Sequence, residues 1–315
     1  MKESDSGTGA PSPVPGREHQ FNDERGIAMK DRLPGAIVKG ISSAGILVML
    51  FILYFLFREG LPVLRSVTLN ELFGGDLWYP AENPPVLGMF PLIAATLAVT
   101  GLSCLLAVPF SLLIAVFVSE TAPRPIREFL KPILELLGFF PSIVLGFIGM
   151  VVLAPWLQET FDMLSGLNLF NASLLLGILT VPVVSSLAEE ALGAVPQDLR
   201  DASYALGATR WETTRKVVIP SALPGILSAS LLGIMRAMGE TMVVLMAAGG
   251  AAIIPLSVFD PVRPLTSTIA AEMGETPVGS PHYAALFFGG VILLVMTLTV
   301  NLLSAWIEKK GKMVR

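Results

Sequence analysis

Residues 195–220 read VPQDLRDASYALGATRWETTRKVVIP and residues 226–249 read ILSASLLGIMRAMGETMVVLMAAG; these two stretches decide the fold. The first is polar and has the residue pattern of short helices. The second is apolar except for Arg236 and Glu240. Because an apolar run of about 20 residues is long enough to cross a bilayer, the pair predicts a polar connector that a soluble partner can touch, followed directly by a membrane span.

The composition of the whole chain is typical of a membrane protein. Of its 315 residues, 53% are hydrophobic and 15% are charged, whereas soluble domains carry about 25% charged residues. The one cysteine, Cys104, lies in an apolar run and is interpreted as a small apolar side chain. The two histidines, His19 and His282, lie far apart in polar stretches, so we expect no metal site and no cofactor on this chain.

Six apolar runs predict six transmembrane helices and hence an all-α integral membrane protein. The runs cover approximately residues 37–57, 90–118, 134–157, 169–187, 223–248 and 283–307. The first run is about 21 residues long, whereas the apolar core of a secretory signal peptide has roughly 7–15. Pro141 lies inside the third run and is expected to kink that helix.

Lysine and arginine are distributed unevenly among the segments that flank these runs. They are frequent before the first run, after the second, after the fourth and at the C-terminus, and the segments between are poor in them or balanced by acidic residues. The positive-inside rule then predicts that both termini and residues 188–222 lie in the cytoplasm.

The chain is expected to divide into four parts. Residues 1–35, rich in Gly, Pro, Ser and charge, are predicted to be a disordered cytoplasmic tail. Residues 36–74 hold the first transmembrane helix and the start of an extracytoplasmic loop. Residues 75–308 form the transmembrane domain, with the polar connector at about 196–220, and residues 309–315 form a basic cytoplasmic tail.

Glycine and proline divide the polar connector into two short helices. Pro196 suits the first turn of a helix that runs to Leu206, and Gly207 fits a C-terminal stop with positive φ. Residues 209–212, TRWE, form a capping-box pattern that starts a second helix, which Pro220 is expected to end or kink. An ordinary connector at the membrane surface has the same local pattern, so these features alone leave its role open.

The connector resembles the EAA motif of ABC importer permeases, which reads Glu-Ala-Ala, three residues, Gly, nine residues, Ile-x-Leu-Pro. The spacing matches in full, with Asp for Glu, Ser for the second Ala, Val for Ile and Ile for Leu. The resemblance implies a type I ABC importer (MetI-like) permease fold, in which this segment is a cytoplasmic coupling helix that docks on an ATPase subunit. The implied coupling residues are Asp201, Ala202, Ser203, Leu206, Gly207, Ala208 and Pro220.

The chain contains no phosphate-binding loop of the form Gly-x-x-x-x-Gly-Lys-Ser/Thr. ATP and its magnesium ion are therefore expected on a separate ATPase partner. This chain is expected to be a permease subunit and not an enzyme.

Arg236 and Glu240 are the charged residues inside the fifth run. A charge at the centre of a lone membrane helix costs roughly 2.5–3.5 kcal/mol. Their i, i+4 spacing predicts a helix face shared with the small residues Ala229, Gly233 and Gly239. The pair is interpreted either as an ion pair that fastens helices or as a site on a transport pathway, and intramembrane ionisable residues favour the second.

Residues 236–241, RAMGET, resemble the Arg-Ala-x-Gly-Glu-Thr motif of phosphate-specific ABC permeases. Further similar strings are FPSIVLG at 140–146, ALGAT at 205–209, IPSALPGI at 219–226, and TSTIAAE at 266–272 with NLL at 301–303. The resemblance covers about residues 75–308. The string MVVLMAAG at 242–249 favours the PstC-type subunit of this family, and Gly250 departs from the Asn expected there.

This resemblance implies a phosphate importer in the plasma (bacterial inner) membrane. The implied partners are a PstA-like second permease subunit, two ATP-binding subunits and an extracytoplasmic phosphate-binding protein. The implied substrate-pathway residues are Arg236, Gly239, Glu240 and Thr241. The guanidinium of Arg236 would bind phosphate oxygens, Glu240 would hold Arg236 and limit its charge, and Thr241 would add a hydroxyl.

Other functions remain open on the sequence. A permease for another oxyanion, such as phosphonate, sulfate or molybdate, would differ in the anions that compete for uptake. An ion-coupled secondary transporter, with Arg236 and Glu240 as a proton relay, would need no ATPase and would leave the motif at 201–220 unexplained. A signalling or scaffold membrane protein is a further alternative.

Overall fold

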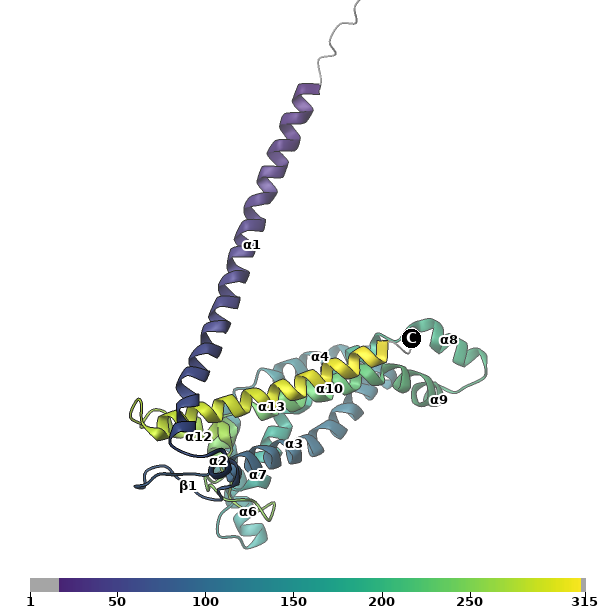
Figure 1. Ribbon diagram of the computed structural model, residues 1–315. Helices are drawn as coiled ribbons and strands as arrows, with labels where there is room; N and C mark the ends of the chain where they lie inside the picture. The colour runs from purple at the N-terminus through teal and green to yellow at the C-terminus, as the bar shows by residue number, and fades with distance from the viewer. Residues whose placement is uncertain (1–16, 313–315) are drawn as a thin grey trace, which may run out of the picture. The chain divides into compact units, whose positions relative to one another are not determined.

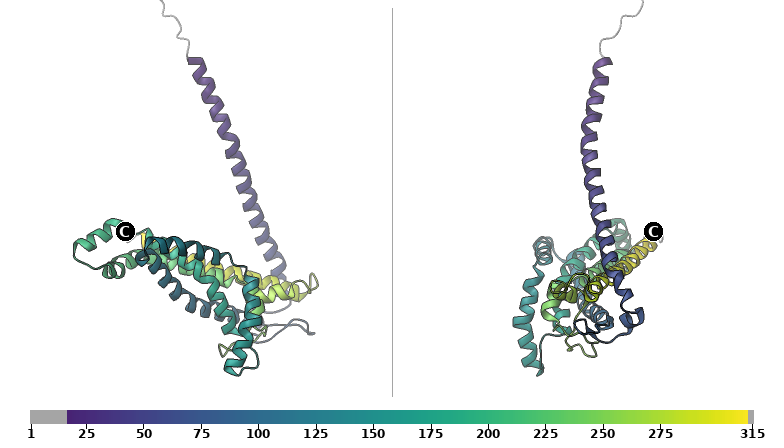
Figure 2. Two further views of the ribbon diagram at one scale, coloured as in Figure 1. Left: turned by 180° about the vertical axis from the view of Figure 1, so that it is seen from behind. Right: turned by 60° about the vertical axis from the view of Figure 1, so that its left-hand side comes forward.

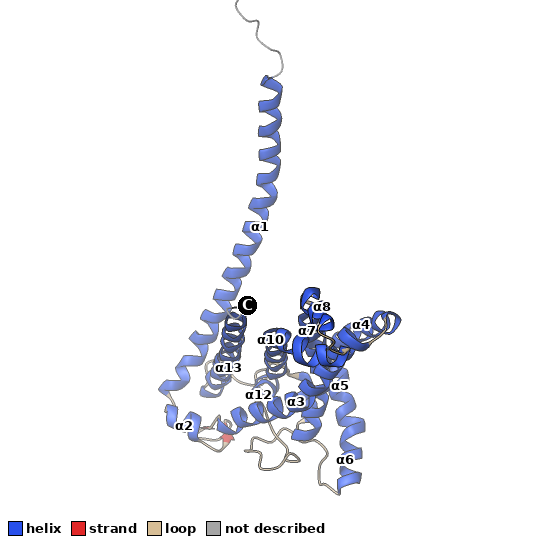
Figure 3. Ribbon diagram, turned by 90° about the vertical axis from the view of Figure 1, so that its right-hand side faces the viewer, coloured by secondary structure: helices blue, strands red, loops and turns tan. Residues whose placement is uncertain are grey.

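The computed structural model describes residues 17–312, which are mostly helical (Figures 1 and 3). The chain separates into two units, residues 1–55 and residues 56–315. Helix α1, Arg17–Gly60, makes up the described part of the first unit and continues into the second. Its side chains from Val38 to Phe55 are mostly exposed, which suits an apolar helix surrounded by lipid.

The predicted disordered tail differs from the structure over residues 17–35, which form the beginning of α1. The remaining residues of that prediction, 1–16, lie outside the described part of the chain. Residues 17–35 contain several Glu, Arg, Gln and Lys residues, which favour helix. A helix already formed in the neighbouring apolar run also extends at little cost per residue, so the composition of the tail was a poor guide to its local structure.

The second unit is a set of helices with one short antiparallel hairpin, in which Trp78 pairs with Leu87. Its elements in chain order are the 3-10 helix η1 (Leu61–Arg65), α2 (Leu69–Gly74), β1 (Trp78–Tyr79), β2 (Val86–Leu87), α3 (Phe90–Val116), the π-helix η2 (Phe117–Thr121), α4 (Arg124–Gly138), α5 (Ser142–Ile148), the π-helix η3 (Gly149–Leu153), α6 (Ala154–Phe161), α7 (Leu169–Gly193), α8 (Gln197–Ala205), α9 (Arg210–Thr213), the π-helix η4 (Thr214–Val218), α10 (Ile219–Met238), α11 (Met242–Ala247), α12 (Leu265–Glu272) and α13 (Pro281–Lys312).

Six helices within the described residues are long and apolar enough to cross a membrane, which confirms the predicted number of spans. They cover Val38–Arg65, Phe90–Thr121, Ser142–Phe161, Leu169–Gly193, Arg210–Met238 and Pro281–Ile307. The third and fifth spans differ most from the sequence prediction. The predicted basic tail at 309–315 is, as far as residue 312, the end of α13.

The third span begins at Ser142 instead of residue 134, which is about two helical turns later than predicted at 3.6 residues per turn. Residues 124–138, which were predicted as a basic loop and the start of this span, form the separate helix α4. Pro141 has an extended backbone, with φ −62° and ψ 120°, and precedes α5. A proline disfavours helical geometry in the residue before it, so Pro141 separates two helices instead of kinking one.

The fifth span was predicted at 223–248, but the helix runs from Arg210 to Met238 and stops there. Pro220 neither ends this helix nor starts a loop; it follows the π-helix η4, where the N–H of Ile219 donates to the carbonyl of Thr214. Such wide turns already interrupt the regular hydrogen bonds, and a proline directly after one is tolerated as in the first turn of a helix. Of the two predicted effects of Pro220, ending the helix is therefore wrong, because the helix continues to Met238.

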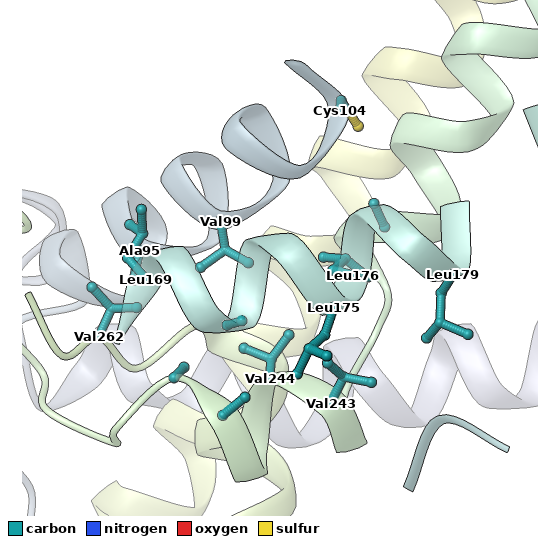
Figure 4. Close-up of a cluster of buried hydrophobic side chains, with 14 residues drawn as sticks. Ala95, Val99, Cys104, Leu169, Leu175, Leu176, Leu179, Val243, Val244 and Val262 are labelled. Atoms are coloured by element: carbon teal, nitrogen blue, oxygen red, sulfur yellow. The ribbon is translucent and has the colours of Figure 1, made fainter. Parts of the chain in front are cut away.

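Helix α7 is the most deeply buried span, because 67% of its apolar window is buried, compared with 33% or less for the others. An apolar cluster surrounds its first half and joins it to α3, α11 and the segment before α12 (Figure 4). Hydrogen bonds between helices add to this packing: Ser111 Oγ donates to the carbonyl of Val181 at 3.2 Å, and Ser173 Oγ to that of Val99 at 3.3 Å. The central position of α7 fixes α3 and α10 on either side of it.

Close contact between α7 and α10 depends on Gly233. A Cβ atom at this position would lie 2.3 Å from Val184 Cγ2 and 3.3 Å from Thr180 Cγ2. We expect Gly233→Ala to lower the thermal unfolding midpoint in detergent, because overpacking a tight contact costs about 1–3 kcal/mol. Gly101→Ala in α3 is the matched control, since no atom lies within 4 Å of its Cβ position, and it should be neutral or slightly stabilising. Equal midpoints for the two variants would contradict the prediction.

Candidate functional site

The fifth span breaks at residues 239–241, at the motif that the sequence singled out. Helix α10 ends at Met238, where the N–H of Gly239 bonds the carbonyl of Met235 at 3.2 Å, and α11 begins at Met242. The prediction that Arg236 and Glu240 share one face of a continuous helix is therefore wrong. The two residues instead lie on either side of a helix break.

Glu240 caps the helix that follows the break. Its Oε1 accepts hydrogen bonds from the N–H groups of Thr241 and Met242, each at 3.1 Å. Its carbonyl oxygen accepts one from Thr266 Oγ1 at 2.8 Å, which connects the break to α12. A carboxylate is favourable at the unpaired N–H groups of a helix start, and the Glu240 carboxylate binds two such groups through Oε1. Among the described side chains, this carboxylate forms no ion pair with Arg236.

Arg236 lies in the last turn of α10 with an exposed side chain. Among the side chains that the structure describes, none forms a hydrogen bond or an ion pair with its guanidinium. Thr241 is half-buried, and its Oγ1 donates to the carbonyl of Gly239 at a long 3.4 Å. The break therefore presents a planar cation whose charge this chain does not neutralise, which suits an anion with paired oxygens.

The small residues expected beside the charged pair have a packing role. Ala229 is buried, and Gly233 contacts α7 as described above. Gly239 has no close neighbour other than the carbonyls of its own helix, 3.7 Å and 3.8 Å from its Cβ position. Of the residues on that predicted face, only Gly239 leaves open space next to the break.

The polar connector folds as predicted into two short helices, α8 and α9, at one end of the second unit (Figures 1 and 2). Gly207 has φ +83°, which confirms the predicted glycine stop. Thr209 and Glu212 form the predicted capping box, with both the side-chain and the backbone bond present. The sequence signals sufficed here because both features depend only on neighbouring residues.

Most of the predicted coupling residues lie at the surface of this connector. The exposed ones are Asp201, Ala202, Leu206, Gly207 and Pro220, while Ser203 and Ala208 are half-buried. Leu206 is 90% exposed. Ser203 Oγ and Thr213 Oγ1 lie 2.9 Å apart, so α8 is fastened to α9.

The connector and Arg236 lie at opposite ends of one helical stretch, which consists of α9, the π-helix η4 and α10. The helix runs from Arg210 to Met238 through 29 residues, which corresponds to about 43 Å at 1.5 Å per residue. The structure therefore does not bring the two predicted sites together. It joins them through this helical stretch.

The sequence prediction missed a polar network at the end of the second unit opposite to α8. The carboxylate of Glu272 binds Arg263 at 2.6 Å and His282 at 2.8 Å, and it accepts the indole N–H of Trp78 at 3.1 Å. Arg263 also donates to the carbonyl of Gly250 at 2.7 Å. Glu272 ends the string TSTIAAE that carried part of the resemblance. Arg263 and His282 lie 9 and 10 residues from it and Trp78 lies 194 residues from it, so no pattern of adjacent residues indicated the network.

Glu272 is expected to stabilise this end of the molecule. Its side chain is 17% exposed. Glu272→Ala therefore leaves the Arg263 guanidinium without its carboxylate partner in a partly buried environment. We expect a loss of about 2 kcal/mol of unfolding free energy, the usual size for a hydrogen bond to a charged group, seen as a lower thermal midpoint. Glu275→Ala, an exposed neighbour, is the control. A midpoint equal to that of the control would disprove the stabilising role.

Comparison with known proteins identifies a family-level match. Residues 107–312 match the model of the family described as binding-protein-dependent transport system inner membrane component. The chain is 36% identical over 304 residues to a probable ABC transporter permease protein, YqgH, of Bacillus subtilis (strain 168), covering 94% of this chain and 98% of that protein. It is 34% identical to the phosphate transport system permease protein PstC of Mesorhizobium japonicum, covering 71% of this chain and 74% of the relative.

Solved structures of ABC transporters have the same fold. An inward-facing MetNI methionine ABC transporter aligns with a TM-score of 0.54 at 22% identity, covering 69% of this chain and 93% of that one. A bacterial alginate ABC transporter in complex with an alginate pentasaccharide-bound periplasmic protein aligns with a TM-score of 0.57 at 14% identity, covering 86% of this chain and 94% of that one. These likenesses agree with the predicted MetI-like arrangement of the helices.

Proposed function

The chain belongs to the binding-protein-dependent transport system inner membrane components, and on that premise we propose that it is the permease subunit of an ATP-driven importer of inorganic phosphate. It is a multi-pass protein of the plasma membrane, and in such systems ATP hydrolysis lies on a separate subunit. The observation that carries the phosphate proposal is the exposed Arg236 guanidinium at the break of α10, which no described side chain of this chain neutralises. The similarity to PstC proteins supports the same substrate.

In the proposed cycle, the importer alternates between a state open to the outside and a state open to the cytoplasm. ATPase subunits close on α8 and its exposed Leu206, and the helix from Arg210 to Met238 carries this movement to the break. Arg236 binds the phosphate oxygens there with two parallel N–H donors. Glu240 keeps the break in shape by capping α11, and Thr241 and Gly239 line the path beside it.

The remaining subunits follow from the same proposal. They are a PstA-like second permease, two ATP-binding subunits that hold ATP and magnesium, and an extracytoplasmic phosphate-binding protein. Residues 75–308 form the permease domain, and both ends of the chain and the 196–220 segment face the cytoplasm. The distribution of lysine and arginine supports this orientation.

The test is uptake of radiolabelled phosphate by cells that lack high-affinity phosphate uptake and receive this chain with all its partners. We expect uptake that requires the ATPase and that excess phosphonate, sulfate or molybdate leaves unchanged. If wild-type chain moves one of those oxyanions and not phosphate, the importer assignment stands and the substrate is wrong. If uptake proceeds when the ATPase is left out, an ion-coupled secondary transporter replaces the proposal.

A further inference from the structure

The strongest polar contact between the coupling segment and the rest of the unit involves two residues that the motif does not include. Arg200 of α8 binds Glu120 of η2, with 2.5 Å between Nη1 and Oε2. The second guanidinium nitrogen of Arg200 donates to the carbonyl of Leu192, at the end of α7, at 2.9 Å. One side chain therefore connects α8 to the ends of two membrane spans.

This contact is partly buried, unlike an ordinary surface ion pair. The Arg200 side chain is 13% exposed and that of Glu120 is 8% exposed. The pair lies near an apolar cluster that joins α3, α7, η4 and α10 and consists of Ala115, Ala188, Leu192, Val195, Val218, Ala222, Ile226 and Ala229. Separating the two charges next to this cluster leaves each without its partner in a poorly hydrated environment. The pair is therefore expected to stay together when α8 moves.

Glu120 lies in the π-helix η2, which α4 also contacts. Arg127 of α4 donates through Nε to the carbonyl of Val118 at 2.7 Å, and through Nη2 to that of Ser119. These carbonyls belong to the π-helix η2, whose wider turn leaves backbone acceptors available. The end of α3 is thus the point where α3, α4, α7 and α8 are fastened together.

Helix α8 has few other attachments. It buries none of its residues. Apart from Arg200, the only described hydrogen bond from an α8 side chain to another element is the contact of Ser203 with Thr213. Ser203 fastens α8 to the long helix that ends near Arg236, and Arg200 fastens it to α3 and α7. Helix α8 is also joined to α7 directly through the chain at residues 194–196. Among the side-chain contacts described, Arg200 is therefore the one that connects α8 to α3.

We propose that the Glu120–Arg200 pair is the connection through which α8 moves α3, and that Arg200 is a positioning residue for the coupling of ATP hydrolysis to transport. This inference rests on the proposed function, in which α8 receives the movement of an ATPase. The pair does not touch the transported anion. Loss of the pair lets the ATPase move α8, α7 and α10 while α3 does not follow.

The experiment measures anion uptake and ATP hydrolysis in proteoliposomes that contain the complete complex and its binding protein. We expect Arg200→Ala to bind the ATPase normally and to lower the number of anions moved per ATP by about tenfold, within the range known for residues that couple sites. Arg200→Lys keeps the charge but not both hydrogen bonds, so its number of anions moved per ATP should lie between those of the wild type and Arg200→Ala. The exchange Glu120→Arg with Arg200→Glu restores the ion pair and should recover part of the ratio.

The exposed pair of Arg124 and Glu128, 3.1 Å apart within α4, provides the control, and the exchange Arg124→Glu with Glu128→Arg should leave the ratio unchanged. If Arg200→Ala moves as many anions per ATP as the wild type, the proposal is wrong. It is also wrong if uptake and hydrolysis fall in proportion, because the pair then only stabilises the fold. A third contradicting result is an exchanged variant that moves as few anions per ATP as Arg200→Ala. The ratio is defined for whichever anion the wild-type complex moves, so failure of phosphate as substrate leaves this test intact, whereas uptake without the ATPase overturns both proposals.

Discussion

Replacing Arg236 by leucine is expected to lower phosphate uptake about a hundredfold while the complex still assembles. The guanidinium is exposed, and no described side chain of this chain pairs with it. Two charge-assisted hydrogen bonds to phosphate oxygens are together worth about 3 kcal/mol, and each 1.4 kcal/mol corresponds to about a factor of ten in binding. The measurement is the rate of radiolabelled phosphate uptake, with pulldown of the ATPase as the check on assembly.

Two further variants sharpen this test. Arg236→Lys keeps the positive charge but loses the planar pair of donors, so it should retain only part of the uptake. Arg65→Leu is a matched control, because Arg65 is also exposed and lies at the end of η1, outside the predicted path. Wild-type uptake in Arg236→Leu would remove this residue from the transport path, and loss of ATPase binding would show that it acts in assembly instead.

Replacing Gly207 by valine is expected to disconnect the permease from its ATPase. Gly207 has φ +83°, and no atom lies within 4 Å of its Cβ position, so the penalty comes from the backbone alone. Left-handed geometry costs roughly 1–2 kcal/mol for an ordinary residue and is more unfavourable for a β-branched one. Because Leu206 and Ala208 flank this turn, the coupling surface changes direction, and both ATPase binding and uptake should fall at least about tenfold.

The matched control for this variant is Gly193→Val. Gly193 is the last residue of α7, close to the same segment, and it also has open space around its Cβ position but no positive φ. We expect normal ATPase pulldown and uptake from Gly193→Val. If Gly207→Val behaves like this control, the left-handed turn is not needed for docking and the coupling role of α8 must rest on other residues.

The outcome at the fifth span shows where sequence reasoning reached its limit. The motif RAMGET was found from its residues, but the helix was predicted to continue through it. Six apolar residues in α11 satisfy the criterion for a continuing span, and hydropathy does not register a break that two backbone N–H groups and the Glu240 carboxylate stabilise. A carboxylate four residues after an arginine was interpreted as an ion-pair partner, when the nearer backbone amides compete for it.

The sequence by itself determined what depends on neighbouring residues. The six spans follow from the length of the apolar runs, and the helix, glycine turn and capped helix of residues 197–213 follow from backbone preferences that act over about four residues.

Only the tertiary structure decided which charged side chains meet. Glu120 and Arg200 are 80 residues apart, and Trp78 and Glu272 are 194 apart. The Glu120–Arg200 contact depends on how α7 packs against its neighbours, a packing that involves small residues such as Gly233 and buried side chains on several helices. The Trp78–Glu272 contact depends on a separate cluster that joins the hairpin to α3, α12 and α13. A pattern of neighbouring residues does not encode packing to which several helices contribute at once. For this reason the candidate residues of the RAMGET motif could be proposed from the chain, whereas the contacts of Glu120, Arg200 and Glu272 could not.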